Sequence, residues 1–423
     1  MRKLYTLLWW AALPWLPLRL WWRGRREPGY REKIGERFGR YGAASAAARD
    51  VLWIHAVSLG ETRAAAPLVK RLLREFPAST VLLTHMTATG REAGASFGDR
   101  VVQAWLPYDV PFALSSFLAR FSPRAGMLME TEVWPNLTAA CASARIPLFL
   151  VNARLSERSL RGYRRFGSVT APMFASLAGV AAQTAADAAR LREAGAADVV
   201  VTGNLKFDAA VDDAVRVRGA ALRETFGTQR PVWVAASTRE GEEALLLDAL
   251  AQARLPPGTL TVIVPRHPQR FDAVAALLDA RKLAFLRRSA DTRVPDDVAL
   301  VLGDSLGELS AYYAAADVAF VGGSLLPLGG QNLIESIAVG TPTLVGPYTY
   351  NFSEAAAQAI AANAALRVAD AKGLLGEVGE LLRDPLRRGR MREAALAFHA
   401  AHRGATDRLW AWLAPRVSRS GGG

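Results

Sequence analysis

Cysteine and histidine are scarce in this sequence. The 423 residues include one cysteine, Cys141, and five histidines. A single cysteine excludes an internal disulfide and is typical of a protein from a reducing compartment. Because Cys141 lies in an apolar stretch, we interpret it as a packing residue. The histidines and the cysteine form no cluster with the spacing of a zinc site.

Several motifs of nucleotide and hydrolase chemistry are also absent. The sequence contains no Walker P-loop and no G-x-S-x-G elbow. It has no Asp-x-Asp metal motif at the end of an expected strand, no low-complexity segment and no short-period repeat. If the protein acts on a phosphate ester, arginine, lysine and helix N-termini must therefore neutralise the phosphate, and we expect neither a metal nor a cofactor.

Apolar residues and positive charge are abundant instead. Hydrophobic residues make up 51% and charged residues 22% of the chain, which is typical of a well-packed globular protein. The length predicts two or three domains. The net charge of +13 and the sequence pI of about 10.3 favour anionic partners such as nucleic acid, acidic lipid or a phosphorylated substrate. Because basic residues are not interleaved with aromatics on one face beyond the first segment, we expect no nucleic-acid partner.

The first segment, residues 4–22, is apolar and rich in tryptophan. It approaches the ~20 residues that cross a bilayer, but two prolines and Arg19 interrupt it. Arginine and lysine dominate residues 23–40, so the positive-inside rule keeps this flank and the chain after it cytoplasmic. No small-residue site follows for signal cleavage. We expect a membrane anchor that either spans the bilayer or lies in its interface, with a buried amphipathic helix as the alternative.

Short apolar runs alternate with helical stretches along the rest of the chain. This alternation predicts βαβ units and parallel sheets, whose strands are buried on both faces. The runs of the first half are Val51–Val57, Thr80–His85, Val101–Trp105, Gly126–Met129, Pro147–Val151, Gly179–Ala182 and Val199–Val201. Those of the second half are Pro231–Ala236, Thr259–Val264, Ala284–Leu286, Val298–Leu302, Val318–Val321 and Pro342–Val345. The pattern therefore predicts two parallel-sheet domains, with a cleft between the loops at the carboxyl ends of their strands.

A glycine-rich stretch dominates the second half. The run Phe320–Leu325 ends in Gly322 and Gly323, and Gly329–Glu335 opens the next expected helix. Glycines at the end of a strand let a ligand approach the backbone, and a helix start offers free N–H groups to an anion. Asn332 and Glu335 lie three residues apart and share a helix face, where Glu335 would accept hydrogen bonds from sugar hydroxyls. An ordinary glycine turn is the alternative.

Acidic residues follow two strands of the first half. Glu61 lies in the first turn of the helix after the first strand, and Glu130 follows Gly126–Met129 directly. A general base is one interpretation of Glu61, and a favourable interaction with the helix dipole is the other. Acids at the end of a strand are not needed for packing. Pro135 suits the first turn of the helix that follows.

Basic residues follow two other expected strands. Lys206 is placed to reach an anion, or else to be solvated beside Asp208. Arg266 follows a buried strand, and a guanidinium grips a phosphate or carboxylate with two hydrogen bonds. The neighbouring His267 is equally well explained as a hydrogen-bonded loop residue.

Serine and threonine predict two helix caps. Ser237 or Thr238 would cap one helix, and Ser305 another. Gly307 would let a ligand lie against the turn after Ser305, so that Leu306–Glu308 contact a nucleotide through the backbone.

Taken together, these motifs resemble the bacterial 3-deoxy-D-manno-octulosonic acid (Kdo) transferases. The likeness runs from the tryptophan-rich start to the last helices. The motifs are His55–Thr62, Leu106–Asp109, Met129–Asn136, Asn152–Ser156, Gly203–Asp208, Pro265–Phe271, Phe320–Leu325 and Gly329–Glu335. Each motif is weak alone, but so many in one order are highly specific.

The resemblance implies an α/β protein of the GT-B type, with two Rossmann-like parallel-sheet domains facing across a cleft. It implies metal-free, inverting transfer of Kdo from CMP-Kdo to a lipid A precursor at the cytoplasmic face of the inner membrane. We expect an N-terminal anchor and basic flank over residues 1–40 and an acceptor domain over 41–207. A nucleotide-sugar domain would follow over 208–423, with its final helices packing back.

The resemblance also implies roles for individual residues. The family's base falls on Glu61, and its transition-state-stabilising positions fall on Glu130 and Lys206. Donor contacts fall on Arg266, His267, Leu306, Gly307, Glu308, Gly323, Ser324, Asn332, Leu333, Ile334 and Glu335. One departure is Gln331, where relatives have histidine.

Two rival functions remain open on the sequence. One is another enzyme of the same fold that uses a UDP-sugar, such as a transferase or an epimerase. The other is a non-catalytic, membrane-bound binder of nucleotides or polyanions. Tighter binding of CMP than of UDP would argue against the first rival, and loss of transfer in Glu61→Gln would argue against the second.

Overall fold

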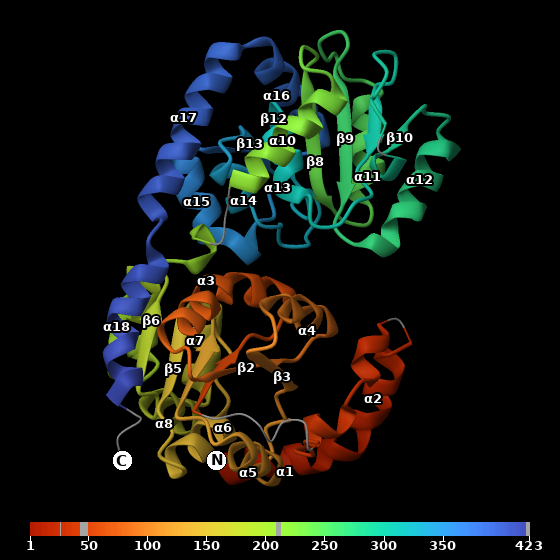
Figure 1. Cartoon of the computed structure of the whole chain (residues 1–423). Coiled ribbons are helices and arrows are strands. Elements are labelled where there is room, and N and C mark those ends of the chain that lie inside the picture. Colours follow the sequence, from red (N-terminus) through yellow and green to blue (C-terminus); the bar gives the residue numbers. More distant parts are fainter. Residues whose placement is uncertain (26, 43–49, 209–212, 291, 420–423) are drawn as a thin grey trace. The chain divides into compact units, whose positions relative to one another are not determined.

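The chain folds into two compact units in a computed structural model that describes residues 1–25, 27–42, 50–208, 213–290 and 292–419. Residues 1–209 and 403–423 form the first unit, and residues 210–402 form the second. Each unit contains a seven-stranded sheet, and helices cover both faces of each sheet (Figure 1). The two units are described separately below.

The first unit contains a parallel sheet in the strand order β3-β2-β1-β4-β5-β6-β7. Neighbouring strands pair in parallel, with Ile54 of β1 opposite Leu83 of β2 and Met127 of β4. The strands are β1 (Val51–His55), β2 (Thr80–His85), β3 (Val101–Trp105), β4 (Ala125–Met129), β5 (Leu148–Ala153), β6 (Gly179–Ala182) and β7 (Val199–Val201). The helices between them are α3 (Leu59–Glu75), α4 (Ala88–Gly94), α5 (Pro111–Phe121), α6 (Pro135–Ser143), α7 (Glu157–Arg165), α8 (Gly167–Ala175) and α9 (Ala185–Glu193).

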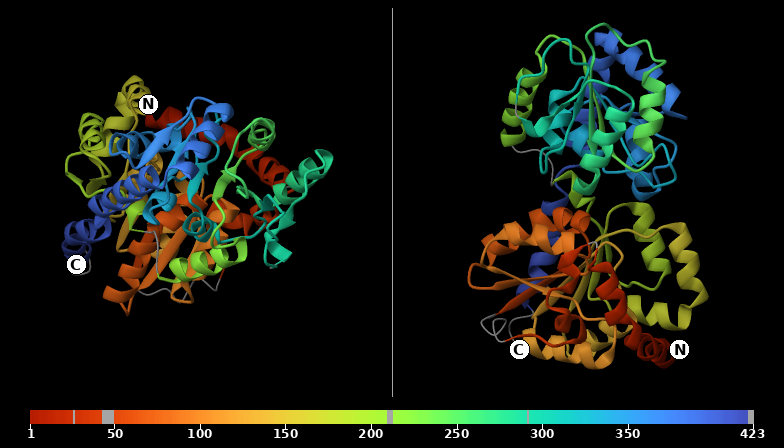
Figure 2. Two further views of the ribbon diagram at one scale, coloured as in Figure 1. Left: turned by 90° about the horizontal axis from the view of Figure 1, so that it is seen from above. Right: turned by 90° about the vertical axis from the view of Figure 1, so that its right-hand side faces the viewer.

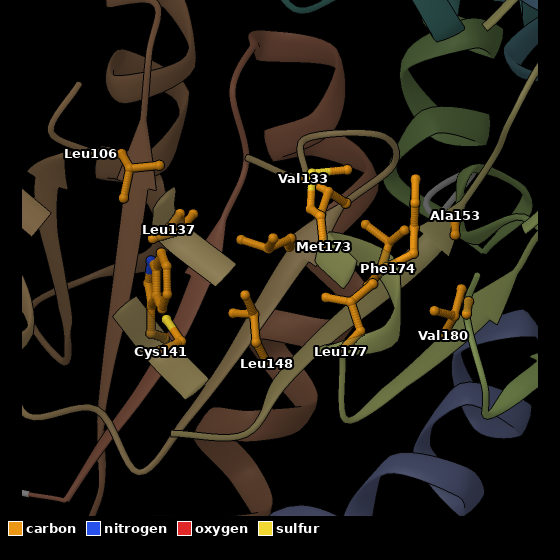
Figure 3. Packing of buried hydrophobic residues seen from close by; sticks show 14 of the residues in the cluster. Leu106, Val133, Leu137, Cys141, Leu148, Ala153, Met173, Phe174, Leu177 and Val180 are labelled. Carbon is orange, nitrogen blue, oxygen red and sulfur yellow. The ribbon is translucent and has the colours of Figure 1, made fainter. Parts of the chain in front are cut away.

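Both faces of this sheet are buried, because successive side chains of each strand point to opposite sides. In β1, Trp53 belongs to the cluster under α5, α6 and α8, whereas Ile54 belongs to the cluster under α3. Figure 3 shows part of the first cluster, in which Cys141 packs with Leu137 and Leu148. The thiol is free and buried, so the prediction that Cys141 is a packing residue is confirmed.

The last helix, α18 (Ala405–Arg419), belongs to the first unit. Its residues Leu409, Leu413 and Val417 are buried in the cluster under α3. The dark blue helix in Figures 1 and 2 therefore completes one face of the first sheet, although it comes from the far end of the chain. The two helices before it, α16 (Ala371–Arg383) and α17 (Pro385–His402), belong to the second unit.

The tryptophan-rich start of the chain forms α1 (Arg2–Ala12), a single 3₁₀ turn over Leu13–Trp15, and α2 (Leu16–Arg23). Pro14 lies at the start of the 3₁₀ turn and Pro17 at the start of α2, because proline suits the first turn of a helix and not its interior. Leu16 and Leu20 pack with Tyr30 and Tyr108 of the first unit. None of the helices in the described ranges combines the length and the apolar character needed to cross a bilayer.

The second unit contains a parallel sheet in the strand order β10-β11-β9-β8-β12-β13-β14. Its strands are β8 (Val232–Thr238), β9 (Leu260–Pro265), β10 (Leu286–Arg287), β11 (Leu300–Leu302), β12 (Val318–Val321), β13 (Thr343–Val345) and β14 (Ala365–Arg367). Besides α16 and α17, its helices are α10 (Asp213–Phe226), α11 (Glu242–Leu250), α12 (Phe271–Ala280), α13 (Leu309–Ala315), α14 (Ile334–Ala338) and α15 (Ser353–Ala361). Trp233, Phe320 and Leu344 centre the cluster on one face, under α16.

The predicted strands agree closely with the observed ones. Five match to the residue, namely β2, β3, β6, β7 and β12. Sequence reasoning missed β14, a three-residue strand at the edge of the second sheet that is only partly buried. So short a run carries too little periodicity to be distinguished from the end of the preceding helix.

Candidate functional site

The carboxyl edge of the first sheet has a topological switch point between β1 and β4. From there the chain winds outward in both directions, to β3 on one side and to β7 on the other. Loops that follow the two central strands diverge at such a point and leave a crevice where ligands bind in parallel sheets. Glu61 follows β1 and Glu130 follows β4, so the two carboxylates predicted from the sequence flank the switch point.

Glu61 is held by the start of α3. Ser58 caps this helix, and its hydroxyl accepts a hydrogen bond from Glu61 N. The Glu61 carboxylate in turn accepts from Val57 N at 2.8 Å through Oε2. This reciprocal arrangement is a form of capping box, so the helix start fixes the side chain as well as the backbone. The contacts that stabilise the start of α3 therefore also fix the Glu61 side chain, so a structural role at the helix start and a role as general base are compatible.

The charge environment of Glu61 raises its proton affinity. Burial, with the neighbouring Glu130 carboxylate as the next cause, raises the pKa of Glu61 to about 8. The hydrogen bond from Val57 and the charge of Lys206 oppose the rise. No ion pair involves Glu61 among the described residues. The deprotonated carboxylate is a stronger base than an ordinary glutamate, and its fraction increases as the pH approaches 8.

Glu130 is ionised beside it. The residue is 4% exposed, and its backbone lies in the left-handed region at φ 58°. Its Oε1 accepts from Lys206 Nζ at 2.7 Å and its Oε2 from Arg154 Nε at 2.9 Å. Burial alone would raise the pKa of Glu130, but Lys206 and Arg154 outweigh burial and lower it. Two cations thus hold a buried carboxylate in its charged form.

Lys206 reaches Glu130 from the end of β7. It lies in a 3₁₀ turn, Leu205–Phe207, which the side chain of Asn204 caps at Lys206 N. The turn is fastened from β5, where the Asn152 side chain accepts a hydrogen bond from Leu205 N at 2.9 Å. The structure therefore brings together the three predicted catalytic residues Glu61, Glu130 and Lys206.

Sequence reasoning assigned no specific role to three further residues of this edge, although it noted the second acid, Glu132, as not needed for packing. Arg154 completes the pairing of Glu130. Glu132 accepts from Trp134 Nε1 at 3.1 Å, and burial raises its pKa. His55, at the end of β1, contacts the Trp134 ring edge-on, and burial lowers the pKa of His55 to about 3. The motifs containing these residues were recognised, but the pattern alone did not say which side chains would meet.

The second sheet has its own switch point, between β8 and β12. The glycine-rich loop follows β12, and Gly322 lies so close to β8 that a Cβ there would come within 2.7 Å of Ser237 O. Gly323, Gly329 and Gly330 all have positive φ. Only glycine meets both demands without strain. The structure gives Gly322 a packing role against the backbone of β8, and the approach of a ligand to this loop stays a prediction.

A buried carboxylate occupies the N–H groups of this loop. Glu242 is fully buried and accepts from Gly323 N at 2.6 Å, Leu325 N at 2.9 Å and Arg239 N at 2.9 Å. The Ser324 hydroxyl donates to Val321 O and accepts from Gly346 N. The Glu242 carboxylate therefore holds the glycine-rich loop from the inside. Gly323 N and the Ser324 hydroxyl are hydrogen-bonded within the protein, so these two residues shape the loop and do not offer these groups to a ligand.

Both predicted helix caps in this unit are wrong. Ser237 and Thr238 belong to β8, and α11 begins after Gly241, whose φ is 90°. Ser305 does not cap α13 either, because that helix begins after Glu308 and the Ser305 hydroxyl contacts Tyr312 OH at 2.8 Å. In both places the helix begins a few residues later than the cap motif predicts, because Ser237 and Thr238 belong to the strand and Ser305 contacts Tyr312.

Arg266 lies at the same edge, after β9. Its Nε donates to Gln331 Oε1 at 3.1 Å, so the residue that departs from the family pattern is part of the site. His267 is exposed, and burial together with Arg266, Arg239 and Arg270 lowers its pKa. The charges of these three arginines make the surroundings of His267 electropositive.

The remaining predicted donor residues lie around α13 and α14. Leu306 is 73% exposed, Gly307 has φ 77°, and Glu308 pairs with Arg288 at 3.4 Å. Asn332 donates to Glu335 Oε1 at 3.1 Å, and Ser310 of α13 donates to Glu335 Oε2 at 3.4 Å. The Glu335 carboxylate therefore links the start of α14 to α13.

Two of these predicted donor contacts are restricted to the backbone. The side chains of Leu333 and Ile334 are almost completely buried in the second unit. A ligand at the start of α14 would reach the peptide groups of these residues and not their side chains.

The comparisons with known proteins agree with this geometry. The family model described as 3-deoxy-D-manno-octulosonic-acid transferase (kdotransferase) matches residues 32–209. A 3-deoxy-D-manno-octulosonic acid transferase of Bordetella pertussis is 50% identical over 97% of this chain and 99% of its own length. The chain belongs to the Kdo transferase family. A second Kdo transferase, from Haemophilus influenzae, is 36% identical over 93% of this chain and 94% of that protein.

Solved structures extend the comparison to the fold of this Kdo transferase. HepE of Anabaena, in complex with UDP, aligns with a TM-score of 0.60 over 88% of this chain and all of that one, at 15% identity. The UDP-GlcNAc 2-epimerase of Neisseria meningitidis aligns with a TM-score of 0.59 over 86% of this chain and 99% of that one, at 16% identity. The predicted GT-B type of fold, with two Rossmann-like parallel-sheet domains, is thereby confirmed, and the chain is a glycosyltransferase.

Proposed function

We propose that this protein transfers Kdo from CMP-Kdo to a hydroxyl of a lipid A precursor in lipopolysaccharide synthesis, with inversion and without a metal ion. The family membership supports the transferred sugar. The observation that carries the mechanism is the pairing at the first switch point, where Glu61 has a raised pKa beside a Glu130 kept ionised by Lys206 and Arg154. One carboxyl is adapted to take a proton, and the other to remain charged.

Glu61 is the general base of this mechanism. It removes the proton of the acceptor hydroxyl while that oxygen attacks the anomeric carbon of Kdo. The bond between this carbon and the phosphate oxygen breaks, and CMP leaves with the electron pair. Attack from the side opposite to CMP inverts the configuration. The proton remains on Glu61 and is lost to solvent afterwards.

Glu130 and Lys206 act on the sugar rather than on the proton. Positive charge develops on the sugar ring as the bond to the leaving group breaks. The Glu130 carboxylate stabilises that charge, and Lys206 fixes its position at 2.7 Å. Because the pair is already in place before the substrate arrives, no reorganisation is needed during the reaction.

The second unit binds CMP in this scheme. Arg266 and the neighbouring His267 hold the phosphate, and Glu335 accepts hydrogen bonds from the ribose. Leu306–Glu308 and Asn332–Ile334 contact the nucleoside through their backbone. Support comes from the concentration of cations around His267 and from the Glu335 carboxylate that bridges α13 and α14.

The decisive experiment uses CMP-Kdo and a tetraacylated lipid A precursor as substrates. We expect the mass of the lipid to increase by one Kdo residue or a small number of them, with release of an equal amount of CMP. Titration with CMP and UDP in the absence of acceptor should give tighter binding of CMP. Tighter binding of UDP, or no change in lipid mass, would overturn the proposed donor or acceptor.

We also propose that the start of the chain docks on the cytoplasmic face of the inner membrane. The exposed apolar side chains of α1, α2 and the 3₁₀ turn between them include Leu7, Leu8, Trp15 and Leu18, and the basic residues 23–40 follow. Apolar side chains inserted beside cations are typical of interfacial helices on anionic lipid.

Vesicle flotation tests this docking. The double variant Leu7→Asp/Leu8→Asp should no longer float with vesicles of anionic phospholipid, whereas Leu386→Asp, which alters an exposed leucine of the second unit, should float like the wild type. Equal flotation of all three proteins would contradict the proposed location.

A further inference from the structure

A second arginine stands beside Arg266, and neither the family resemblance nor the motif analysis gave it a role. Strands β8 and β9 pair in parallel with Thr238 opposite Pro265. The residues that follow on the two strands are Arg239 and Arg266. A backbone hydrogen bond from Arg266 N to Thr238 O at 3.0 Å joins the strands at that point. The two arginines therefore leave the sheet side by side.

Their side chains border the same glycine. A Cβ placed on Gly323 would lie 3.5 Å from Arg239 Cγ and 3.1 Å from Gln331 Nε2. Gln331 is the residue that accepts the hydrogen bond of Arg266 Nε. Gly323 thus lies close to Arg239 and to the Gln331 side chain that Arg266 contacts, and even a Cβ at this position would crowd Gln331.

The charge of Arg239 is not matched by an ion pair among the described residues. Nearby Arg270 is compensated by the buried Glu243 at 2.9 Å, and the Glu242 carboxylate is occupied by backbone N–H groups. For Arg239, the described residues provide no ion pair and no side-chain hydrogen bond. Placing adjacent guanidinium groups together is unfavourable unless an anion joins them, which indicates that this position is built for a negatively charged ligand.

The proposed nucleoside contacts help to assign the two arginines to different parts of that ligand. These contacts follow β11 and β12 and meet where Ser310 of α13 donates to Glu335 of α14 at 3.4 Å. Arg266 follows β9 and contacts Gln331, close in sequence to Asn332 and Glu335, whereas Arg239 follows β8. A donor with its nucleoside at α13 and α14 and its phosphate at Arg266 would have its sugar next to Arg239, beside Gly323.

We propose that Arg239 binds the carboxylate of the donor sugar, and that Arg266 binds its phosphate. The inference rests on the proposed function, because the donor CMP-Kdo carries both groups. A guanidinium matches the two oxygens of a carboxylate with two parallel hydrogen bonds. Arg239 then selects a keto-acid sugar over a neutral sugar on the same nucleotide, and is a specificity-determining residue for the donor.

Comparison of CMP with CMP-Kdo tests this assignment, because CMP retains the phosphate and lacks the carboxylate. In Arg239→Gln we expect the KM for CMP-Kdo to rise roughly 10- to 100-fold, as for loss of a charged hydrogen-bonded contact. The Kd of CMP, measured calorimetrically, should stay within about twofold of the wild type. Unchanged CMP binding also shows that the variant is folded.

Two further variants sharpen the test. Arg254→Gln removes one positive charge from an exposed loop after α11, at the opposite edge of the same sheet, and should leave both constants unchanged. Arg239→Lys keeps the charge without the two-pronged geometry and should give an intermediate KM for CMP-Kdo.

The opposite results are equally clear. If Arg239→Gln weakened CMP as much as CMP-Kdo, Arg239 would be a phosphate ligand, and the assignment would be overturned. The assignment would also be overturned if neither constant changed. Failure of the wild-type protein to bind either CMP or CMP-Kdo would instead overturn the proposed function, and the inference with it.

Discussion

The carboxyl edges of the two sheets each have a switch point beside the first strand of the unit, but the charges gathered there differ. At the switch point of the first sheet, three glutamates, Glu61, Glu130 and Glu132, meet the cations Lys206 and Arg154. At the switch point of the second sheet, arginines surround His267, and the carboxylates Glu242 and Glu243 are buried beneath them.

This difference shows that the fold supplies a place for chemistry without deciding its kind. Parallel strands present their end loops to one edge in both units, and the residues of those loops set the charge. We propose that the first edge supplies the proton acceptor and that the second binds the anionic donor. The following predictions test that division, from the largest expected effect to the smallest.

The substitution Glu61→Gln should have the largest effect. Removal of a general base lowers the rate of transfer roughly 100- to 10,000-fold, while CMP binding by the second unit should be unchanged. Product mass and calorimetric CMP titration measure the two properties. The control is Glu75→Gln, at the exposed far end of the same helix. Transfer at the full rate in Glu61→Gln would remove Glu61 from the mechanism.

Breaking the ion pair of the first edge should destabilise the first unit. Lys206→Met leaves the buried Glu130 with Arg154 as its ion-pair partner among the described residues. Loss of one partner of a buried pair costs about 3 kcal/mol, which should lower the midpoint of urea unfolding. Lys70→Met, on the exposed face of α3, is the matched control.

The double variant Glu130→Gln/Lys206→Met distinguishes pairing from packing. Because it also removes the uncompensated charge, its unfolding midpoint should lie above that of Lys206→Met. If the two substitutions lowered the midpoint additively, the pair would contribute no coupling energy to the first unit.

In the second unit, the buried Glu242 carboxylate accepts hydrogen bonds from backbone N–H groups of the glycine-rich loop. Glu242→Gln replaces one acceptor oxygen by an NH₂ group and leaves a buried N–H of the glycine loop unpaired, at a cost of about 1–3 kcal/mol. We expect a lower unfolding temperature and roughly tenfold weaker CMP binding. Glu240→Gln, whose side chain is 91% exposed, should behave like the wild type. Unaltered CMP affinity in Glu242→Gln would show that the loop does not depend on this anion.

The smallest effect expected is a shift in pH dependence. A base must be deprotonated to act, so kcat/KM should rise with pH until it levels off above the Glu61 pKa of about 8. Glu130→Gln removes the negative charge that contributes to this raised pKa, so the inflection should move to lower pH. A shift to higher pH would contradict the proposed coupling of the two carboxyls.

Part of the candidate site was predictable from local pattern alone. Glu61 follows a buried strand and a helix cap, and Arg266 follows a buried strand, so both had to lie at a carboxyl edge. The glycines near Gly323 marked a close backbone approach. Arg239 and Glu242 were overlooked because their motif resembled a simple helix cap, whereas β8 continues through Thr238 and the helix begins only after Gly241.

By itself the sequence determined the α/β architecture, most strand positions and the family, because periodic burial and ordered motifs are local properties of the chain. Only the tertiary structure decided which charges meet. Lys206 and Glu130 are 76 residues apart, and Glu242 reaches Gly323 across 81 residues. Such contacts depend on the order of strands in the sheet, and the pKa of Glu61 depends in turn on the burial and the neighbours that this order creates.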